Sequence, residues 1–565
     1  MNKLFFLVLI VISANGNLLS KKLDSTSSSS NSLNVVSFTS SNLPIIVINT
    51  HGQQIVDDYK ITADMGIIYN GEGVRNNLTD PFNNYNGKIG IEIRGSSSQM
   101  FPKKQYSVET RDLSGNDLDV SLLGFPAEND WVLYAPYNDK SLIRDVLVYR
   151  LANDMGRYAS RSKFCEVVLN NEYAGVYVLF EKIKRDVNRV NIKKLNPTDI
   201  SGDALTGGYI IKIDKTDGEN NAGWFSNYLP FPQLPNKILY QYHVPKPDEI
   251  VQQQMTYIQS LIFNFETIMK YSSNIADSAT GYPKYIDTDS FVDFILINEL
   301  VKNVDAYRLS TFLYKDRDSR NTKLFAGPVW DFNIAFGNAD YYEGWMTNGW
   351  QLEHLTNSQN IPSYEPFLTP FWWRKLFDDT KFRNRVYARW QNVKNGSFKV
   401  QNIYHYVDSL VQLLDESKSR NFEKWPTLGI WVWPNYFVGQ TYEQEINYLK
   451  SWTANRINWL DQNMIGEPTD LNDPNYPLPS DFSLDQNYPN PFNPETIIPF
   501  NMKSSGIAEI AVFNILGKKV FDKTLYGYGG ENQFVFNGSN LESGIYFYSL
   551  KAFGFNQARK MCLVK

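Results

Sequence analysis

A proline- and asparagine-rich segment, residues 467–482, divides the chain into two parts that are expected to fold around separate cores. The chain has 565 residues, which is longer than one hydrophobic core usually serves. After the segment, short apolar runs alternate with turn residues, at 507–513, 518–521, 533–536, 544–551 and 557–564. This spacing predicts a small β-sandwich over residues 483–565.

The first 16 residues have the pattern of a signal peptide. Lys3 supplies a positive charge, the apolar run at 4–12 is too short to span a bilayer, and residues 14–16 offer small side chains for cleavage. Residues 17–41 contain a Ser-rich tract and are expected to form a flexible leader. A buried N-terminal strand is the alternative. We therefore expect an exported protein without a transmembrane anchor.

Charge and metal-binding residue types exclude several classes of function. The net charge is −5, so the chain has no overall positive charge to neutralise phosphates, and nucleic acid is not an expected partner. The two cysteines are far apart in the sequence, which excludes a disulfide framework and a Cys-rich zinc site. The four histidines are scattered without paired metal-ligand spacing, which disfavours a His-based zinc hydrolase.

The periodicity of apolar residues changes along the first part of the chain. Strand-like patterns occur at 43–48, 89–93, 105–110, 164–169, 176–180 and 207–213, and one long helix is predicted at 140–155. From residue 255 onward the pattern becomes helical, at 255–269, 291–301, 381–393 and 403–420. Asp289 or Ser290 is the expected cap of the second of these helices. The predicted fold class is α+β, with a β-rich N-terminal part and a helical C-terminal part.

The loop at residues 94–104 combines an arginine, a glycine, three serines and two lysines between two predicted strands. Backbone N–H groups and hydroxyls in a tight loop can bind phosphate oxygens, lysines add point charges, and arginine can bind bidentately. Arg94, Ser96, Lys103 and Lys104 are therefore candidate phosphate contacts. A solvated hairpin with surface charges is the alternative.

Two further charged segments could contribute to an anion site. Arg144 lies near the first turn of the long helix, whose N-terminus favours anions. A plain helix cap by Asp139 or Ser141 explains the same segment. Glu181 and Lys182 follow a predicted strand, where a carboxylate can orient an ammonium toward phosphate. A charged strand exit is the alternative for this pair.

Two aspartates have the arrangement that phosphoryl transfer needs. Asp305 follows the predicted helix at 291–301. After an intervening hairpin, Asp331 ends a predicted strand, and its sequence neighbours are Trp330 and Phe332. One carboxylate would orient the attacking hydroxyl and take its proton, and the other would hold Mg²⁺ on the nucleotide phosphates. Exposed turn aspartates are common, so the pair alone does not identify an enzyme.

Taken together, these segments resemble the spore coat protein H (CotH) kinase-like family over residues 42–466. The matching stretches occur in family order: IEIRGSSSQMFPKKQYSVETRD, LLGFPAENDWVLYAPYNDKSLIRD, EVVLNNEYAGVYVLFEKIKRDVNRVNI, GGYIIKIDK, NELVKNVDAYRLSTFLYKD, GPVWDFNIAFGN, PFWWRKLF and RNFEKWP. The resemblance implies a highly diverged protein-kinase fold that uses ATP and Mg²⁺ to phosphorylate Ser or Thr of secreted or surface proteins.

The resemblance also implies roles for individual residues. Asp305 resembles the catalytic aspartate, and Asp331, with Asn333, resembles the metal-binding element. Candidates for nucleotide contacts are Arg94, Ser96, Lys103, Lys104, Arg144, Glu181 and Lys182.

Two positions depart from the expected pattern. Ser310 stands where protein kinases place an asparagine after the catalytic aspartate, and Asn333 stands where many family members carry a second aspartate. Both changes remove strong oxygen ligands, which is expected to weaken Mg²⁺ binding. A catalytically inactive kinase-fold protein, acting as a surface adhesin or scaffold, is therefore the alternative function.

The tail has a resemblance of its own. The stretches LDQNYPNPFNP, AVFNILGK and SGIYF look like the C-terminal sorting domain of type IX secretion substrates, an immunoglobulin-like β-sandwich. The resemblance implies recognition by the type IX secretion machinery and passage through a periplasm to the outside. An ordinary carbohydrate-binding or spacer sandwich is the alternative.

Overall fold

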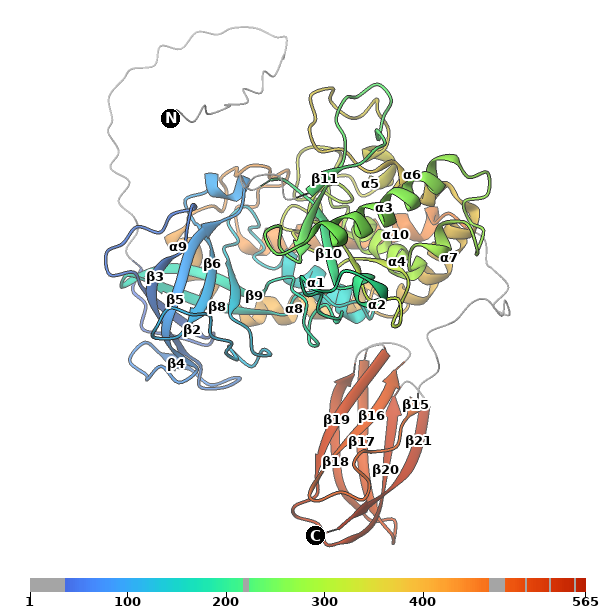
Figure 1. Cartoon of the computed structure of the whole chain (residues 1–565). Coiled ribbons are helices and arrows are strands. Elements are labelled where there is room, and N and C mark those ends of the chain that lie inside the picture. Colours follow the sequence, from blue (N-terminus) through green and yellow to red (C-terminus); the bar gives the residue numbers. More distant parts are fainter. Residues whose placement is uncertain are drawn as a thin grey trace, which may run out of the picture.

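The computed structural model describes residues 36–216, 223–466, 483–502, 506–527, 530–552 and 555–564. As predicted, a β-rich N-terminal part precedes a helical part and a final set of strands (Figure 1). The predicted signal peptide, the whole 467–482 linker and residues 17–35 of the predicted leader lie outside the described residues. At the end of the predicted leader, strand β1 (Ser40–Ser41) pairs with β4 (Asn76–Asn77).

The N-terminal part is a closed barrel of seven strands. Around the barrel the strands follow the order β2, β3, β5, β6, β7, β9, β8. All neighbouring strands are antiparallel except β2 and β8, whose parallel pairing closes the barrel. The bounds are β2 (Ile45–Asn49), β3 (Ile61–Ile68), β5 (Tyr85–Arg94), β6 (Gln105–Arg111), β7 (Asp130–Tyr134), β8 (Ser162–Leu169) and β9 (Glu172–Glu181).

Alternating side chains fill the interior of the barrel, as the period of a strand requires. Ile89 and Ile91 on β5, Trp131 and Leu133 on β7, and Tyr177 on β9 belong to one buried apolar cluster. Between β5 and β6 the Ser-rich loop forms a short 3₁₀ helix, η1 (Ser97–Met100). Helix α1 (Arg144–Asp154) connects β7 to β8 and is shorter than the predicted 140–155 segment.

The second part contains a five-stranded antiparallel sheet in the order β11, β12, β10, β13, β14, surrounded by helices (Figure 1). The strands are β10 (Tyr209–Ile213), β11 (Gly223–Phe225), β12 (Leu239–Val244), β13 (Thr311–Lys315) and β14 (Leu324–Ala326). The helices are α2 (Gly202–Leu205), α3 (Gln252–Tyr271), η2 (Tyr282–Lys284), α4 (Thr288–Val301), α5 (Gln351–Leu355), α6 (Phe371–Asp378), α7 (Thr380–Val393), α8 (Val400–Leu413), α9 (Ser417–Lys424) and α10 (Tyr442–Asn463).

Helix α4 is at the centre of this part, and nearly all of its residues are buried. Its N-cap is Asp287, whose side chain accepts a hydrogen bond from the Ser290 N–H, so the prediction of Asp289 or Ser290 as the cap is wrong. The predicted helix at 403–420 is two helices, α8 and α9, because a turn at residues 414–416 interrupts it.

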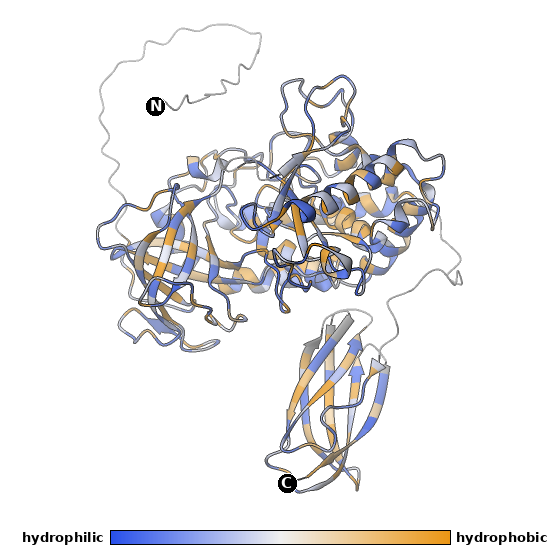
Figure 2. Cartoon of the chain, viewed as in Figure 1, coloured by the Kyte–Doolittle hydropathy of each residue, from blue (hydrophilic) through white to orange (hydrophobic). Residues whose placement is uncertain are grey.

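The tail forms two antiparallel sheets around one apolar core. One sheet has the order β15 (Ser483–Leu484), β16 (Glu495–Met502), β19 (Gly530–Asn537). The other has the order β18 (Lys519–Gly527), β17 (Gly506–Asn514), β20 (Gly544–Ala552), β21 (Phe555–Leu563). Hydrophobic and hydrophilic residues alternate along these strands (Figure 2). Among the described helices, none is long and apolar enough to cross a membrane.

A buried carboxyl group lies where the sheet meets α3. Glu266 is 2% exposed and accepts hydrogen bonds from Ser226 Oγ and Tyr240 Oη, both at 2.8 Å. Burial raises the pKa of Glu266 to about 7, although the two hydrogen bonds oppose this shift. Because the folded pKa exceeds the unfolded value, this group stabilises the fold fully below about pH 4.5, and the contribution is lost as pH rises through 7.

We expect Glu266→Gln to flatten the dependence of stability on pH. The free energy of unfolding of the wild type should fall relative to that of the variant by about 2–3 kcal/mol between pH 5 and 8, because only the wild type must bury a charge at the higher pH. Urea unfolding at several pH values measures this difference. Glu72→Gln, at an exposed site, is the matched control, and parallel pH curves for wild type and Glu266→Gln would contradict the expectation.

Candidate active site

The loop between α4 and β13 places Asp305. Three non-glycine residues of this loop have left-handed backbone conformations. They are Lys302, Tyr307 and Ser310, with φ of 47°, 69° and 45°. Such conformations are costly for ordinary residues and persist only where the surroundings hold them. Tyr307 is held by its hydroxyl, which donates to Glu299 on α4 at 3.0 Å. The Asp305 carboxylate accepts a hydrogen bond from Arg308 Nη2 at 2.9 Å.

Asp331 lies beyond β14 and does not end a strand, contrary to the sequence prediction. Its backbone is left-handed, with φ of 67°. The Asp331 N–H donates to Tyr149 Oη at 3.3 Å, and the next N–H, of Phe332, donates to Asp145 Oδ1 at 2.7 Å. Asp145 and Tyr149 are one turn apart on α1, so this helix fixes the segment that carries Asp331.

Four carboxylates form what we name the acidic cluster: Asp145, Asp214, Asp305 and Asp331. Desolvation by the surrounding protein, followed by the charges of Asp305 and Asp214, raises the pKa of Asp331 to about 6, although its side chain remains accessible to solvent. Burial and then the charge of Asp331 raise the pKa of Asp145 to about 8. The hydrogen bonds from Phe332 N–H to Asp145 and from Ser310 N–H to Asp214 agree with this arrangement, because each joins one of these acids to the loop that carries another.

The side chain of Tyr341 lies within reach of the charges of two of these acids. Burial raises the pKa of its hydroxyl, and the charges of both Asp305 and Asp331 add to the shift. The two aspartates predicted from the sequence therefore act on the same neighbouring side chain.

Two cations and the Ser-rich loop accompany the acidic cluster. The Arg94 and Lys215 charges both act against the raised pKa of Asp331. The Arg94 guanidinium lies 5.8 Å from the centre of the Trp330 ring, and Lys215 Nζ donates to Ser97 Oγ at 3.4 Å. Arg94 is thus brought to the predicted site together with the loop that follows it.

Ser96, Lys103 and Lys104 are placed differently. Ser96 precedes η1 and makes no side-chain cap hydrogen bond there. Lys103 is buried, and its ammonium donates to Val176 O at 2.6 Å, Asn421 Oδ1 at 2.8 Å and Pro136 O at 3.3 Å. Lys104 Nζ donates to Gln99 O within the loop at 2.6 Å. The structure therefore does not bring these two lysines to the acidic cluster.

Arg144, Glu181 and Lys182 also make contacts of their own. Arg144 is buried in an ion pair with Asp139, and its Nε donates to Ala335 O at 3.0 Å, so it anchors the segment after Asp331. Glu181 is buried between Arg161 at 2.9 Å and Arg189 at 3.0 Å. Lys182 Nζ lies 3.6 Å from Asp130, and burial lowers its pKa.

Asn333 belongs to a network of amides next to the acidic cluster. Its Nδ2 donates to Asn138 Oδ1 at 3.1 Å, and its backbone carbonyl accepts from Asn338 Nδ2 at 2.7 Å. Asn435 Nδ2 donates to the Asn138 carbonyl at 2.7 Å. The Asn333 amide therefore supports the loop and offers only a neutral oxygen to a cation.

The donor set fits a magnesium–nucleotide complex better than a metal ion bound by protein alone. In the described part of the chain, no three His, Cys, Asp or Glu side chains gather closely enough to hold a metal ion. Mg²⁺ commonly takes one or two carboxylates and completes its shell with phosphate oxygens and water. Asp331 and Asp305 would supply these carboxylates. Among the described residues, the buried Asp145 Oδ2 has no hydrogen-bond partner.

The sequence prediction missed Asp145, Asp214 and Lys215. Asp145 lies four residues before Tyr149 on α1, and a carboxylate within an otherwise apolar helical stretch was the available signal. Asp214 and Lys215 directly follow the apolar strand β10, where polar residues leave the sheet. The Asp214 carboxylate accepts a hydrogen bond from the Ser310 N–H at 3.3 Å, which ties β10 to the Asp305 loop.

Comparisons with known proteins agree with both resemblances. A family model described as CotH kinase protein matches residues 91–460, and one described as secretion system C-terminal sorting domain matches residues 486–564. Inner spore coat protein H of Bacillus subtilis (strain 168) is 22% identical over 288 residues, which cover 50% of this chain and 70% of that relative. The sorting domain indicates type IX secretion to the cell surface or the extracellular space. Because the first match covers more than half of the chain, the chain belongs to the CotH kinase protein family.

Proposed function

We propose that this protein is an exported kinase that transfers the γ-phosphoryl group of ATP to Ser or Thr hydroxyls of a secreted or surface protein. The observation that supports this function best is the electrostatic coupling of Asp305 and Asp331 beside Arg94 and Lys215. Phosphoryl transfer uses one carboxylate as the base and another to hold a metal cation. Further cations bind the phosphates.

In this proposal the Asp305 carboxylate orients the acceptor hydroxyl and takes its proton. Arg308 fixes that carboxylate, and Glu365, 3.3 Å from Arg308, fixes the guanidinium. Asp331 would hold Mg²⁺, which would neutralise charge on the nucleotide phosphates. Arg94 and Lys215 provide the remaining positive charge, whereas Lys103, Arg144 and Glu181 act through the fold.

We expect Asp305→Asn to lower phosphoryl transfer by about 10²–10⁴-fold, because an amide cannot accept the hydroxyl proton. Transfer is measured with the full chain, radiolabelled ATP, Mg²⁺ and dephosphorylated casein as a general Ser/Thr acceptor. Binding should persist: Mg²⁺ and ATP at a hundredfold excess over the dissociation constant should still stabilise the variant by about 2.7 kcal/mol. Asp119→Asn, at an exposed site in the barrel part, is the control.

Full transfer by Asp305→Asn would contradict the assignment of the base. Absence of any stabilisation of the wild type by millimolar Mg²⁺ and ATP would contradict the kinase function as a whole.

The second candidate is a catalytically inactive surface adhesin or scaffold. The observation that favours it is the neutral character of Ser310 and Asn333, since the Asn333 amide is engaged with Asn138. Such a protein would give no stabilisation by nucleotide and no transfer, so the experiment above separates the two candidates.

We also propose that the kinase-like domain extends over residues 42–466, with a signal peptide at 1–16, a linker at 467–482 and the sorting domain at 483–565. The family match begins at residue 91, yet β2 and β3 precede it and supply two of the seven barrel strands. A barrel without them would expose the edges of β5 and β8. A truncation at residue 91 is therefore not expected to fold.

A further inference from the structure

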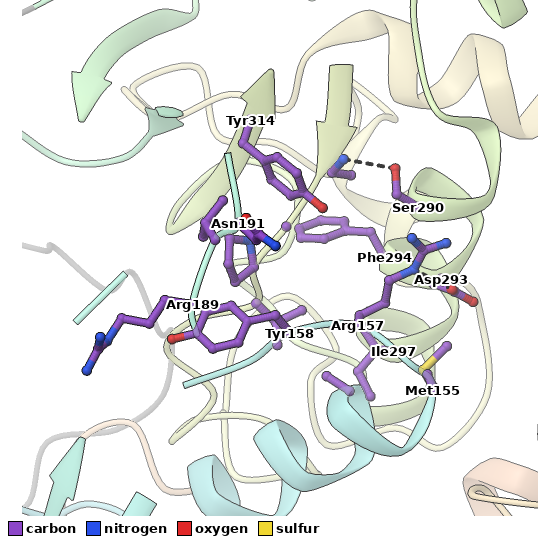
Figure 3. Close-up of a pocket in the computed structure, with 16 residues that line it drawn as sticks. Met155, Arg157, Tyr158, Arg189, Asn191, Ser290, Asp293, Phe294, Ile297 and Tyr314 are labelled. Carbon is purple, nitrogen blue, oxygen red and sulfur yellow. Dashed lines mark hydrogen bonds and ion pairs between the residues drawn. The ribbon is translucent and has the colours of Figure 1, made fainter. Parts of the chain in front are cut away.

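A cavity of about 220 Å³ lies apart from the acidic cluster, and none of the four acids lines it. Four parts of the chain form its walls: the end of α1 with the residues that follow it, the first turns of α4, β13 and β14 with the Gly327–Val329 segment, and residues 189–191. Ala152, Met155, Phe294 and Ile297 give it an apolar lining. Figure 3 shows the rings of Tyr314 and Phe294 turned toward its centre.

The cavity also has polar groups on its walls. The Tyr314 hydroxyl makes no hydrogen bond to any residue that the structure describes, and Asn191 lies at an exposed position of the lining. Arg157 donates through Nε to Asp293 at 2.7 Å, while its Nη1 is 3.9 Å from Asp287. The Arg189 guanidinium points away (Figure 3), toward its ion pair with Glu181.

Size and charge define the ligand that fits. A dry apolar cavity of about 150 Å³ accepts benzene, so 220 Å³ accepts one aromatic ring with a small polar substituent. The Phe294 and Tyr158 rings offer surfaces against which another ring can pack. Arg157 shares Asp293 with Arg389, each at 2.7 Å, and also lies 3.9 Å from Asp287. Two arginines therefore face two carboxylates, and a net charge on the ligand would have no countercharge. Its substituent should therefore be an uncharged hydrogen-bonding group.

Three of the walls, those formed by α1, by α4 and by the segment after β14, continue into residues of the acidic cluster. Helix α1 carries Asp145 and Tyr149, which hold the backbone at Asp331 and Phe332. Helix α4 leads into the Asp305 loop, and Val329 is two residues before Asp331. A ligand that fills the cavity contacts all three elements at once.

We propose that this cavity is a regulatory site for a small, uncharged aromatic compound that carries an amide or hydroxyl group, and that its occupancy orders the segment bearing Asp331. The ring packs against Phe294 and Tyr158. An oxygen of the substituent accepts hydrogen bonds from the Tyr314 hydroxyl and the Arg157 guanidinium. Regulation of nucleotide binding rests on the proposed kinase function, whereas occupancy of the cavity does not.

Benzamide is the probe for occupancy, and titration calorimetry with the full chain measures it. We expect a dissociation constant on the order of 1 mM or tighter for a ligand of this size. Asn191→Trp places a large ring at the exposed part of the lining and should weaken binding at least about tenfold. Asn188→Trp, exposed in the same loop but not lining the cavity, should leave it unchanged. Tyr314→Phe should weaken it about 2–10-fold by removing one hydrogen bond.

Benzylamine, which carries a positive charge, should not bind. Failure of benzamide to bind the wild type, or equal binding by Asn191→Trp, would overturn the site whatever the protein does with ATP. Saturating benzamide should tighten Mg²⁺-dependent ATP binding about 2–5-fold in the wild type and not in Asn191→Trp. Benzamide binding without this change would overturn the regulatory role. Absence of ATP binding in every sample would instead count against the kinase function.

Discussion

Replacement of Asp331 by asparagine is expected to lower phosphoryl transfer from ATP by about 10³-fold, with no loss of thermal stability. The loss of transfer follows from the proposed role of this carboxylate in holding Mg²⁺ on the phosphates, where charge develops during the reaction. Mg²⁺-dependent stabilisation by ATP should disappear as well, which distinguishes Asp331→Asn from Asp305→Asn.

The direction in which Asp331→Asn changes the stability of the fold follows from the pKa of Asp331. The pKa of Asp331 is raised to about 6 in the folded protein. Its contribution to stability is therefore complete below about pH 3.8 and is lost as pH rises through 6. At pH 8, without metal or nucleotide, removal of this charge should leave the unfolding temperature unchanged or raise it. A clear fall would instead assign Asp331 a structural role, and Asp119→Asn serves again as the control.

The largest loss of stability is expected for Arg456→Met. Arg456 and Glu299 are both fully buried and joined at 3.0 Å. Arg456 also donates to the carbonyls of Glu299, Thr347 and Gly349. Methionine would leave the Glu299 carboxylate without a countercharge inside the protein. Breaking such a pair from one side costs about 3–5 kcal/mol in the free energy of unfolding.

Urea unfolding, monitored by tryptophan fluorescence, measures this loss for the part of the chain before residue 467. All 13 tryptophans precede residue 467, so the signal does not report on the tail. Arg374→Met is the matched control, because Arg374 and Asp378 form an exposed pair on α6, worth less than about 1 kcal/mol. The double variant Arg456→Met/Glu299→Gln should recover part of the lost stability, and a single variant as stable as the wild type would contradict the expectation.

Periodic segments of the chain could be predicted, but their interruptions could not. The α4 segment has apolar residues on every side and was recognised as a helix. Its cap was misplaced because Asp287, Asp289 and Ser290 are all suitable caps, and only the geometry selects Asp287. The break between α8 and α9 was missed because residues 414–416 contain neither glycine nor proline.

For the candidate site, the sequence predicts which aspartates take part better than it predicts which lysines lie near them. Asp305 and Asp331 were predicted from their order along the chain, and both lie in the acidic cluster. Lys103 was expected at a phosphate, yet it is bound by Asn421, more than 300 residues away in the sequence. No local pattern in a sequence contains such a contact, so a buried lysine and a phosphate-binding lysine look alike.

The parallel pairing of β2 with β8 has a consequence for the order in which the protein can fold. Ile45 is paired with Glu166, so the barrel stays open until more than one hundred further residues have been made. Contacts between such distant positions form slowly, because the intervening chain must first lose its freedom. Until β8 has been made, β2 has only β3 as a partner, and its other edge is open. The topology of the barrel therefore makes the pairing of β2 with β8 a late step of folding.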